Sequence, residues 1–286
     1  MELNESTKYF NIEAMPPEFN VLMQAISNCA GPVVHQILQQ QPQLINHKGW
    51  HGNTALHRAC LVGDISVVAL LVNAGADTNT LNDSGESPVH YAAKRGIPSV
   101  LHILTKHGGD VTTTDKHGRR ITHHASETGS VYMLHYLSTV HSVSFRDVDK
   151  KLQSPLHIVC GFGHAEAFKY LIRKERSDLT QGDFAGNTPM HLTVEEGHSH
   201  LTWLLLRAVG CGSLHHRNKA GYTPVDIACQ RDKAGHKEIT PLLKSYEGVR
   251  DHSYKPSGSD VATVMALAVT SSIYDCVCCS VKLLIQ

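Results

Sequence analysis

A short motif recurs along the chain at nearly constant intervals, and this recurrence limits the fold more than any other feature of the sequence. The first copy is GNTALHRACLVGD, residues 52–64, with a core Thr-Ala-Leu-His that begins at Thr54. Corresponding cores begin at Ser87, Arg120, Ser154, Thr188 and Thr223. Successive starts are 33, 33, 34, 34 and 35 residues apart. Such a period predicts repeated units that each contain a turn and two helices.

Each unit carries its own helix signals. The Ser or Thr at five of the six starts is placed to act as an N-cap, and most are followed by Pro at the first helical position. A second, outer helix is indicated by apolar side chains at helical spacing, as in Ile65, Val68 and Leu71. Gly75, Gly108 and Gly210 are expected to end such helices. Since no unit can bury its apolar stripe alone, stacking on neighbours must stabilise it.

The repeated pattern resembles the ankyrin repeat family. The generic family pattern of Asp-x-x-Gly-x-Thr-Pro-Leu-His-x-Ala-Ala, followed by Gly-His and Val-x-x-Leu-Leu, is similar to residues 82–103 with few departures. The resemblance covers roughly Gly49 to Leu243, with a weaker unit before it. It implies an all-α, ankyrin-repeat solenoid of about seven helix-turn-helix units joined by β-hairpin-like loops.

The chain is predicted to divide into five parts. These are an N-terminal extension (1–17), an N-terminal capping repeat (18–48), six ankyrin repeats (49–244), a linker (245–260) and an apolar C-terminal tail (261–286). The capping repeat is identified from Asn20 to Ala25, which aligns with Thr54 to Ala59 at an offset of 34 residues. It lacks Thr, Pro and His, as a terminal repeat can.

Two units depart from the pattern. The third has Arg120 at the cap position, no Pro after it, and Thr122 at the apolar Leu position. The fourth has Leu152 where the Gly of the hairpin turn belongs.

The bulk composition favours an intracellular protein with no polyanionic target. Lys plus Arg and Asp plus Glu both total 26, so nothing global indicates nucleic-acid binding. The first residues lack the pattern of a secretory signal. Cys60, Cys160 and Cys229 fall at one equivalent repeat position, which predicts reduced, buried side chains rather than disulfides. We expect a cytoplasmic location, with a nuclear or membrane-associated one as alternatives.

The abundant histidines raise the question of a metal site. His57, His90, His123, His157 and His191 recur once per repeat. Neighbouring repeats lie about 10 Å apart, whereas zinc ligands all lie about 2 Å from one ion. We therefore expect a structural ladder, with no metal site and no cofactor. The family resemblance implies that this His forms hydrogen bonds within and between repeats.

No enzymatic chemistry is indicated. The sequence lacks a Gly-x-Ser-x-Gly elbow, a His-Glu-x-x-His pair and a phosphate-binding Gly-x-x-x-x-Gly-Lys loop. The run Asp183-Phe184-Ala185-Gly186 resembles a kinase motif only by accident, since it occupies the hairpin of its repeat. We predict that the chain is not an enzyme.

The family resemblance implies that the hairpin tips and the two residues before the conserved Gly line one concave face, which binds another protein. Apolar residues at one end, a basic middle from Lys94 to Lys151 broken by Glu127, and aromatic and acidic residues beyond it occupy these positions. The predicted partner-binding residues are Trp50, His51, Leu61, Lys94, Arg95, Lys116, Arg119, Glu127, Phe162, Phe184, Glu195 and Tyr222. The predicted function is that of a non-catalytic interaction module or adaptor.

Two segments suggest covalent modification. Asn79 matches a loop Asn that is hydroxylated in some ankyrin proteins, although a turn-forming role explains it as well. In the tail, Cys276, Cys278 and Cys279 are candidates for acylation.

The apolar tail leaves a second function open. A docked terminal helix is favoured over membrane contact, because Asp275 and Lys282 interrupt the apolar run. The alternative function is the regulatory or substrate-recruiting arm of a larger membrane protein, such as an ankyrin-containing palmitoyltransferase or channel.

Overall fold

The computed structural model describes residues 16–175, 179–209, 211–230 and 234–247. These residues form α-helices and short 3-10 turns, and they contain no β-strand. The helices are α1 (Pro17–Ser27), α2 (Gly31–Gln40), α3 (Ala55–Val62), α4 (Ile65–Asn73), α5 (Pro88–Arg95), α6 (Pro98–Lys106), α7 (Ile121–Thr128), α8 (Val131–Val140), α9 (Pro155–Phe162), α10 (Ala165–Glu175), α11 (Pro189–Glu196), α12 (Ser199–Val209), α13 (Pro224–Gln230) and α14 (Ala234–Glu247).

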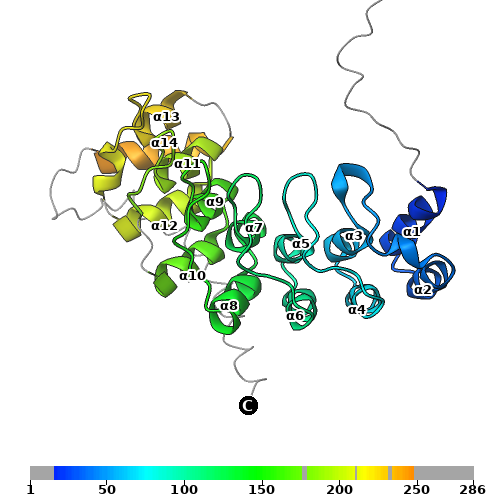
Figure 1. The fold of residues 1–286 in the computed structure, drawn as a ribbon. Helices are drawn as coiled ribbons and strands as arrows, with labels where there is room; N and C mark the ends of the chain where they lie inside the picture. Colours follow the sequence, from blue (N-terminus) through cyan, green and yellow to red (C-terminus); the bar gives the residue numbers. More distant parts are fainter. Residues whose placement is uncertain (1–15, 176–178, 210, 231–233, 248–286) are drawn as a thin grey trace, which may run out of the picture.

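The helices stack as a solenoid of two rows. In Figure 1 the odd-numbered helices from α3 to α9 form an inner row, and α4, α6 and α8 form an outer row below it in this view. Each inner helix packs against the inner helix of the next unit, as α3 does with α5 and α5 with α7. Seven helix pairs are present in the described residues, so the predicted all-α solenoid is confirmed.

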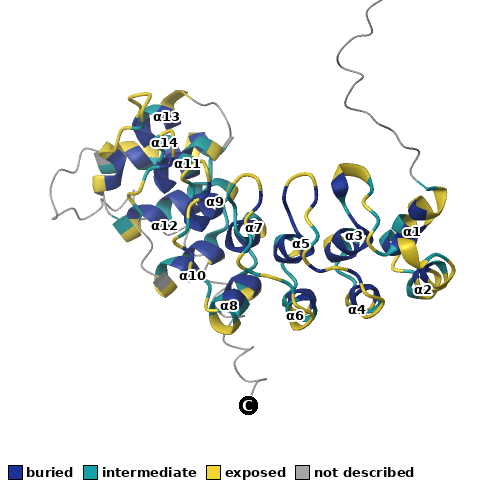
Figure 2. Cartoon of the chain, viewed as in Figure 1, coloured by how far each residue is buried: buried dark blue, intermediate teal, exposed yellow. Residues whose placement is uncertain are grey.

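One continuous apolar core runs through the stack. It extends from Phe19 in the first helix to Leu243 in the last. Ala92 and Ala125 are fully buried on the inner helices, where small side chains let neighbouring helices approach closely. In Figure 2 buried residues lie between neighbouring helices, whereas the hairpin loops carry much of the exposed surface. The core therefore belongs to the contacts between units.

The N-cap and the ladder histidine together join each unit to the next. The Thr54 N–H donates to His57 Nδ1 at 3.1 Å, so the ring proton is on Nε2. His57 Nε2 then donates to the Glu86 carbonyl of the following unit at 3.0 Å. Equivalent bonds to the next unit extend from His123, His157 and His191. The implied hydrogen bonds within and between repeats are confirmed at these positions.

Two ladder positions differ from the others. In the third unit the Arg120 N–H still donates to His123 Nδ1 at 3.1 Å, so α7 begins normally although no hydroxyl caps it. In the second unit His90 Nε2 has no hydrogen-bond partner of ordinary geometry among the described residues. Here the ladder lacks a hydrogen bond of ordinary geometry, although the Thr113 backbone of the third unit still lies close enough to act on the pKa of His90.

The hairpin tips form a second ladder. A buried Asp or Asn, at 82, 115, 149 and 183, closes the turns of the second to fifth repeats, as Asp149 does when its Oδ1 accepts the N–H groups of Lys151 and Gln153. The tip of one hairpin donates a backbone N–H to the tip before it, with Lys150 N bonded to His117 O at 2.9 Å. Leu152 adopts the left-handed conformation at φ 57°, where the equivalent positions carry Gly. The missing Gly thus leaves the turn intact, at the cost of local strain.

Gly75 and Gly108 follow the outer helices α4 and α6 with positive φ, as predicted, and Gly210 lies outside the described residues.

Cys60 and Cys160 are buried, and burial raises the pKa of the Cys160 thiol to about 12, which makes it unreactive. The prediction was wrong for Cys229, which is exposed. Its helix α13 packs on α11 and α14, with no further inner helix on its other side in the described part of the chain.

The end of the array differs slightly from the predicted boundary. Helix α14 includes residues 245–247, which the sequence assigned to the linker. The remainder of the linker, the apolar tail and residues 1–15 lie outside the described residues. Among the helices that the structure describes, none combines the length and apolarity needed to span a membrane.

Replacing Leu152 with Gly should stabilise the array. A non-Gly residue in the left-handed region costs about 1–2 kcal/mol, which Gly avoids, although Gly gains entropy in the unfolded chain. We expect the free energy of unfolding to rise by about 1 kcal/mol in urea titrations. Gly85→Ala serves as the control and should destabilise, since its Cβ would lie 2.9 Å from the Lys116 backbone nitrogen. A Leu152→Gly chain with a lower midpoint than wild type would contradict the strain.

Stability should decrease below neutral pH. Burial lowers the pKa of His57, His123 and His191, and it lowers that of His90 to about 4. In the unfolded chain these rings titrate near about pH 6.5, so below that pH the unfolded state binds more protons than the folded state. The stabilisation is therefore complete above about pH 6.5 and is lost as the pH falls toward 4.

We expect a lower urea midpoint at about pH 5.5 than at about pH 7.5, equivalent to a loss of about 1 kcal/mol or more. His90→Gln removes one of the titrating groups and should make the difference smaller. An unchanged or higher midpoint at the lower pH would rule out the neutral, buried ladder.

Candidate functional site

The predicted apolar binding residues remain exposed on the assembled array. Trp50 is 75% exposed, Phe184 65% and Phe162 58%, and Leu61 and Tyr222 are also exposed. They lie on hairpin tips or at the C-terminal ends of inner helices, which we call the concave face. Because the core is already complete without them, their exposure is not required for folding.

The aromatic residues of the concave face are held by neighbours. The Phe162 ring stacks on His164 with a centroid distance of 6.1 Å. Lys219 lies over the Phe184 ring, with its Nζ 4.6 Å from the ring centroid. Such contacts fix ring orientation while leaving a face open to solvent.

Several cations of the predicted basic middle form ion pairs or hydrogen bonds with neighbouring residues. Arg119 is mostly buried, and it donates to Asp115 Oδ2 at 2.9 Å and to Glu127 Oε1 at 2.6 Å. Lys94 Nζ lies 3.5 Å from Glu127 Oε2. Arg95 Nε is 3.5 Å from the Val62 carbonyl. Of the predicted cations, Lys116 stands exposed at its hairpin tip, without an ion pair to another described residue.

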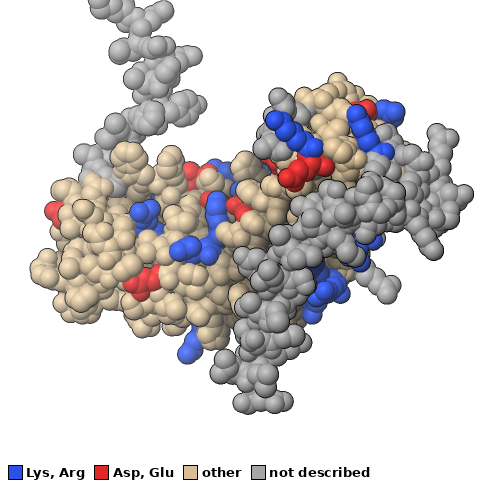
Figure 3. Space-filling model, turned by 180° about the vertical axis from the view of Figure 1, so that it is seen from behind, with Lys and Arg blue, Asp and Glu red and all other residues tan. Residues whose placement is uncertain are grey.

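Positively and negatively charged side chains therefore lie close together on the surface of this protein. On the face drawn in Figure 3, Lys and Arg side chains lie close to Asp and Glu side chains. Glu195, at the C-terminal end of α11, is only partly exposed. The concave face thus combines apolar and aromatic anchors with paired charges and with the exposed lysines Lys116, Lys150 and Lys151.

A buried polar cluster that the sequence did not reveal lies beneath Arg119. His124 is fully buried, with Nε2 3.3 Å from Asp115 Oδ2 and Nδ1 3.8 Å from Glu86 Oε1. Burial alone raises the pKa of Asp115, but contacts with His124 and Arg119 hold that pKa well below its usual range. Glu86, Asp115 and His124 are close enough together to share a metal ion. The Arg119 guanidinium already occupies the Asp115 carboxylate and supplies positive charge there.

The neighbouring His123 points elsewhere, since its Nε2 bonds to the Gln153 carbonyl. The His123-His124 pair thus forms no joint site.

Removing the Arg119 guanidinium should destabilise the array strongly. Arg119→Met leaves the buried Asp115 and the partly buried Glu127 without their main cation, and breaking a buried pair typically costs about 3–5 kcal/mol. The matched control is Arg217→Met, because Arg217 and Asp226 form a largely exposed pair at 3.7 Å. Loss of an exposed pair should cost less than about 1 kcal/mol. Equal shifts of the urea midpoint in the two variants would show that the buried cluster is not stabilised by Arg119.

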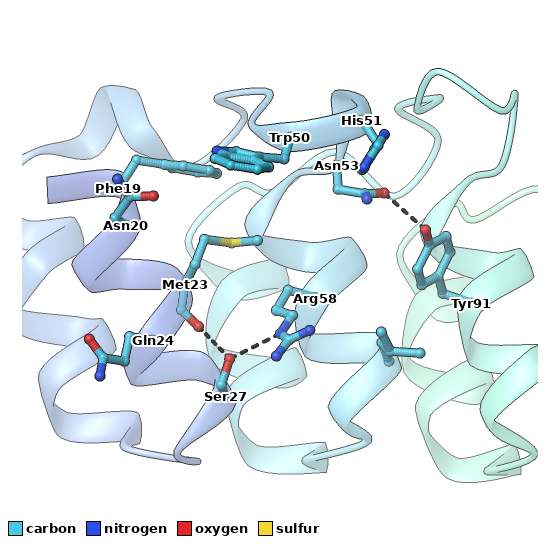
Figure 4. A pocket seen from close by; sticks show the side chains of 11 residues that line it. Phe19, Asn20, Met23, Gln24, Ser27, Trp50, His51, Asn53, Arg58 and Tyr91 are labelled. Atoms are coloured by element: carbon cyan, nitrogen blue, oxygen red, sulfur yellow. Dashed lines mark hydrogen bonds between the residues drawn. The ribbon is translucent and has the colours of Figure 1, made fainter. Parts of the chain in front are cut away.

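A groove opens between the capping unit and the first repeat, with a cavity volume of about 490 Å³. Three predicted residues, Trp50, His51 and Leu61, meet there. In Figure 4 Phe19 and Trp50 lie side by side along one edge, and below them a dashed line joins Arg58 to Ser27. The groove is lined by Phe19, Asn20, Met23, Gln24, Ser27, Trp50, His51, Asn53, Arg58, Leu61 and Tyr91.

Asn79 has a structural role in its loop. Its Nδ2 donates to the Gly108 carbonyl at 2.8 Å, and its Oδ1 accepts the Asp110 N–H at 2.9 Å. Asn46 makes the equivalent bridge one unit earlier, to Gly75 and Asp77. Hydroxylation of Asn79 stays a prediction. Cys276, Cys278 and Cys279 lie outside the described residues.

Known proteins share both the sequence pattern and the fold. A 93-residue segment is 33% identical to human transient receptor potential cation channel subfamily A member 1 and covers 29% of this chain and 8% of the channel. A 77-residue segment is 35% identical to the Notch-regulated ankyrin repeat-containing protein of Xenopus laevis, covering 26% of this chain and 68% of that protein. The chain thus spans only a small part of the channel.

The fold is similar to the crystal structure of the human ASB11 ankyrin repeat domain. The TM-score is 0.66 at 20% identity, over 82% of this chain and 99% of that domain. The family model for ankyrin repeats (3 copies) matches residues 22–115, 62–147, 122–213 and 156–256. Together with the stacked helix pairs, this match shows that the chain belongs to the ankyrin repeat family.

Proposed function

We propose that this protein is a non-catalytic adaptor that binds a partner protein through the concave face of its ankyrin array. Ankyrin repeats are a general protein-interaction fold, and nothing in the fold itself selects a partner. We further propose that it acts in the cytoplasm or nucleus, without a cofactor and without binding nucleic acid.

The observation that carries the proposal is the exposure of large apolar side chains at positions that the fold does not need. Trp50, Phe162 and Phe184 are each more than half exposed, on tips or helix ends of different repeats. Aromatic residues of this kind carry much of the binding energy at protein interfaces. Hydrogen bonds between successive hairpin tips hold Trp50 and Phe184 in place, so little ordering of these two is required on binding.

The test is affinity purification from cell lysate with quantitative mass spectrometry. We expect Phe162→Ala/Phe184→Ala to lose bound proteins by about tenfold or more, with an unchanged thermal melt. The control is Tyr132→Ala, because Tyr132 is 77% exposed on the outer helix α8, away from the concave face. If the double variant and the control retain the same bound proteins as wild type, the concave face is not the binding surface.

A second candidate function is the regulatory or recruiting arm of a larger membrane protein. The similarity to an ankyrin-containing channel supports it, although only 29% of this chain is matched. A chain ending at Lys255 distinguishes the two functions in the same experiment. Loss of membrane proteins from this shortened chain, with full binding by the Phe162→Ala/Phe184→Ala chain, would favour the membrane arm.

A further inference from the structure

The groove between the capping unit and the first repeat points to a more specific ligand. We infer that it binds an extended segment of a partner protein in which an Asp or Glu lies next to a bulky apolar side chain. This inference rests on the proposed adaptor function and names the chemistry of the segment that the adaptor recognises.

Arg58 is the residue that selects a carboxylate. It is partly buried, and its Nε donates to Ser27 Oγ at 2.9 Å. The Ser27 hydroxyl itself donates to the Met23 carbonyl at 2.7 Å. Arg58 forms no ion pair with any residue that the structure describes, so most of its five N–H donors remain available. A guanidinium fork with free donors matches a carboxylate in geometry and charge.

Comparison with equivalent positions shows that this availability is unusual. Tyr91 and His124 occupy the same place in the second and third units, one residue after the ladder His. The Tyr91 hydroxyl donates to Asn53 Oδ1 at 3.1 Å, and His124 lies 3.3 Å from the Asp115 carboxylate. Both therefore have polar partners inside the protein. Arg58, in contrast, has one hydrogen-bond partner, the Ser27 hydroxyl, and its charge has no counterion in the described residues.

The remaining walls of the groove suit an apolar neighbour. Trp50, Met23 and Leu61 line it, and Trp50 is 75% exposed, so its ring offers a broad surface for packing. Asn20 and Gln24 lie exposed at the edge, where their amides can bond to the backbone of an extended segment. No Asp or Glu is among the lining residues, so nothing there repels a carboxylate.

The groove fits a protein segment better than a polyanion. Nucleic acids and anionic membranes are bound by several cations that act together, whereas Arg58 is the one Lys or Arg lining this groove. A volume of about 490 Å³ accommodates a few side chains. One guanidinium beside an apolar platform therefore recognises one carboxylate and one large side chain.

The test begins with selection from a random linear peptide library displayed on phage, using the full chain as bait. We expect the selected peptides to share an Asp or Glu next to Leu, Phe or Trp. One selected peptide and its matched copy, with Gln in place of Glu or Asn in place of Asp, are then measured by calorimetry. The copy should bind about tenfold or more weakly, because it loses a charge-assisted contact.

A double-mutant cycle assigns this loss to Arg58. On an Arg58→Gln chain, both peptides should bind equally and about tenfold or more weakly than the acidic peptide binds wild type. Arg173→Gln is the matched control, since Arg173 is exposed in the last turn of the outer helix α10, outside the groove, and affinity should not change. Trp50→Ala should also weaken binding, and thermal melts check that each variant is folded.

The inference is overturned by a selection that yields no binders or no acidic preference, or by the same acid-to-amide loss on the wild-type and Arg58→Gln chains. The adaptor proposal fails separately, when Phe162→Ala/Phe184→Ala retains every partner. A failed groove experiment together with partner loss in that double variant would leave the adaptor function standing without this groove.

Discussion

The structure depends on the contact between one helix pair and the next. A unit of two helices of about ten residues cannot bury its apolar side chains alone, so each pair is folded only against its neighbours. The ladder histidine strengthens this contact, because it accepts the N-cap N–H of its own unit and donates to a carbonyl of the next, as His57 does with Thr54 and Glu86. One side chain thus couples the start of a helix to the placement of the following hairpin.

This arrangement separates the residues that build the array from those that can bind. One group of side chains forms hydrogen bonds within and between units: the capping residues, the ladder histidines and the hairpin Asp or Asn. The hairpin tips and the ends of the inner helices are fixed in space by those contacts but are not used in them. Trp50 and Phe184 are exposed for this reason, on a scaffold whose tips are joined by backbone hydrogen bonds. Rigid placement of exposed aromatic side chains is what an interface needs from its scaffold.

The sequence predicted the fold well because a repeat shows its pattern several times. The period, the N-caps and the apolar stripes each recur, so the position of a residue within its unit gives its environment. This reasoning gave less about side-chain contacts between a hairpin and a helix, and about the end of the array. Arg119 was expected to face a partner, but it is held by Asp115 and Glu127, and its pairing with Glu127 depends on how a hairpin meets the inner helix that follows it. Cys229 was expected to be buried, but in the described chain no further inner helix covers that side of α13.

The groove is a second feature that could not be predicted from the repeat pattern. The capping unit was recognised from a weak alignment of residues 20–25, which gave no sign that Met23 and Ser27 would face Arg58. Yet Arg58, Tyr91 and His124 share one place in the repeat, and the structure gives each a different neighbour on the preceding side. Tyr91 meets Asn53 of the first repeat, and His124 meets Glu86 of the second, whereas Arg58 meets a capping helix whose lining residues carry no carboxylate. Among the described residues, the charge of Arg58 therefore lacks a counterion at a position that is equivalent from repeat to repeat, because the first unit is irregular and a terminal unit has room to differ from its neighbours.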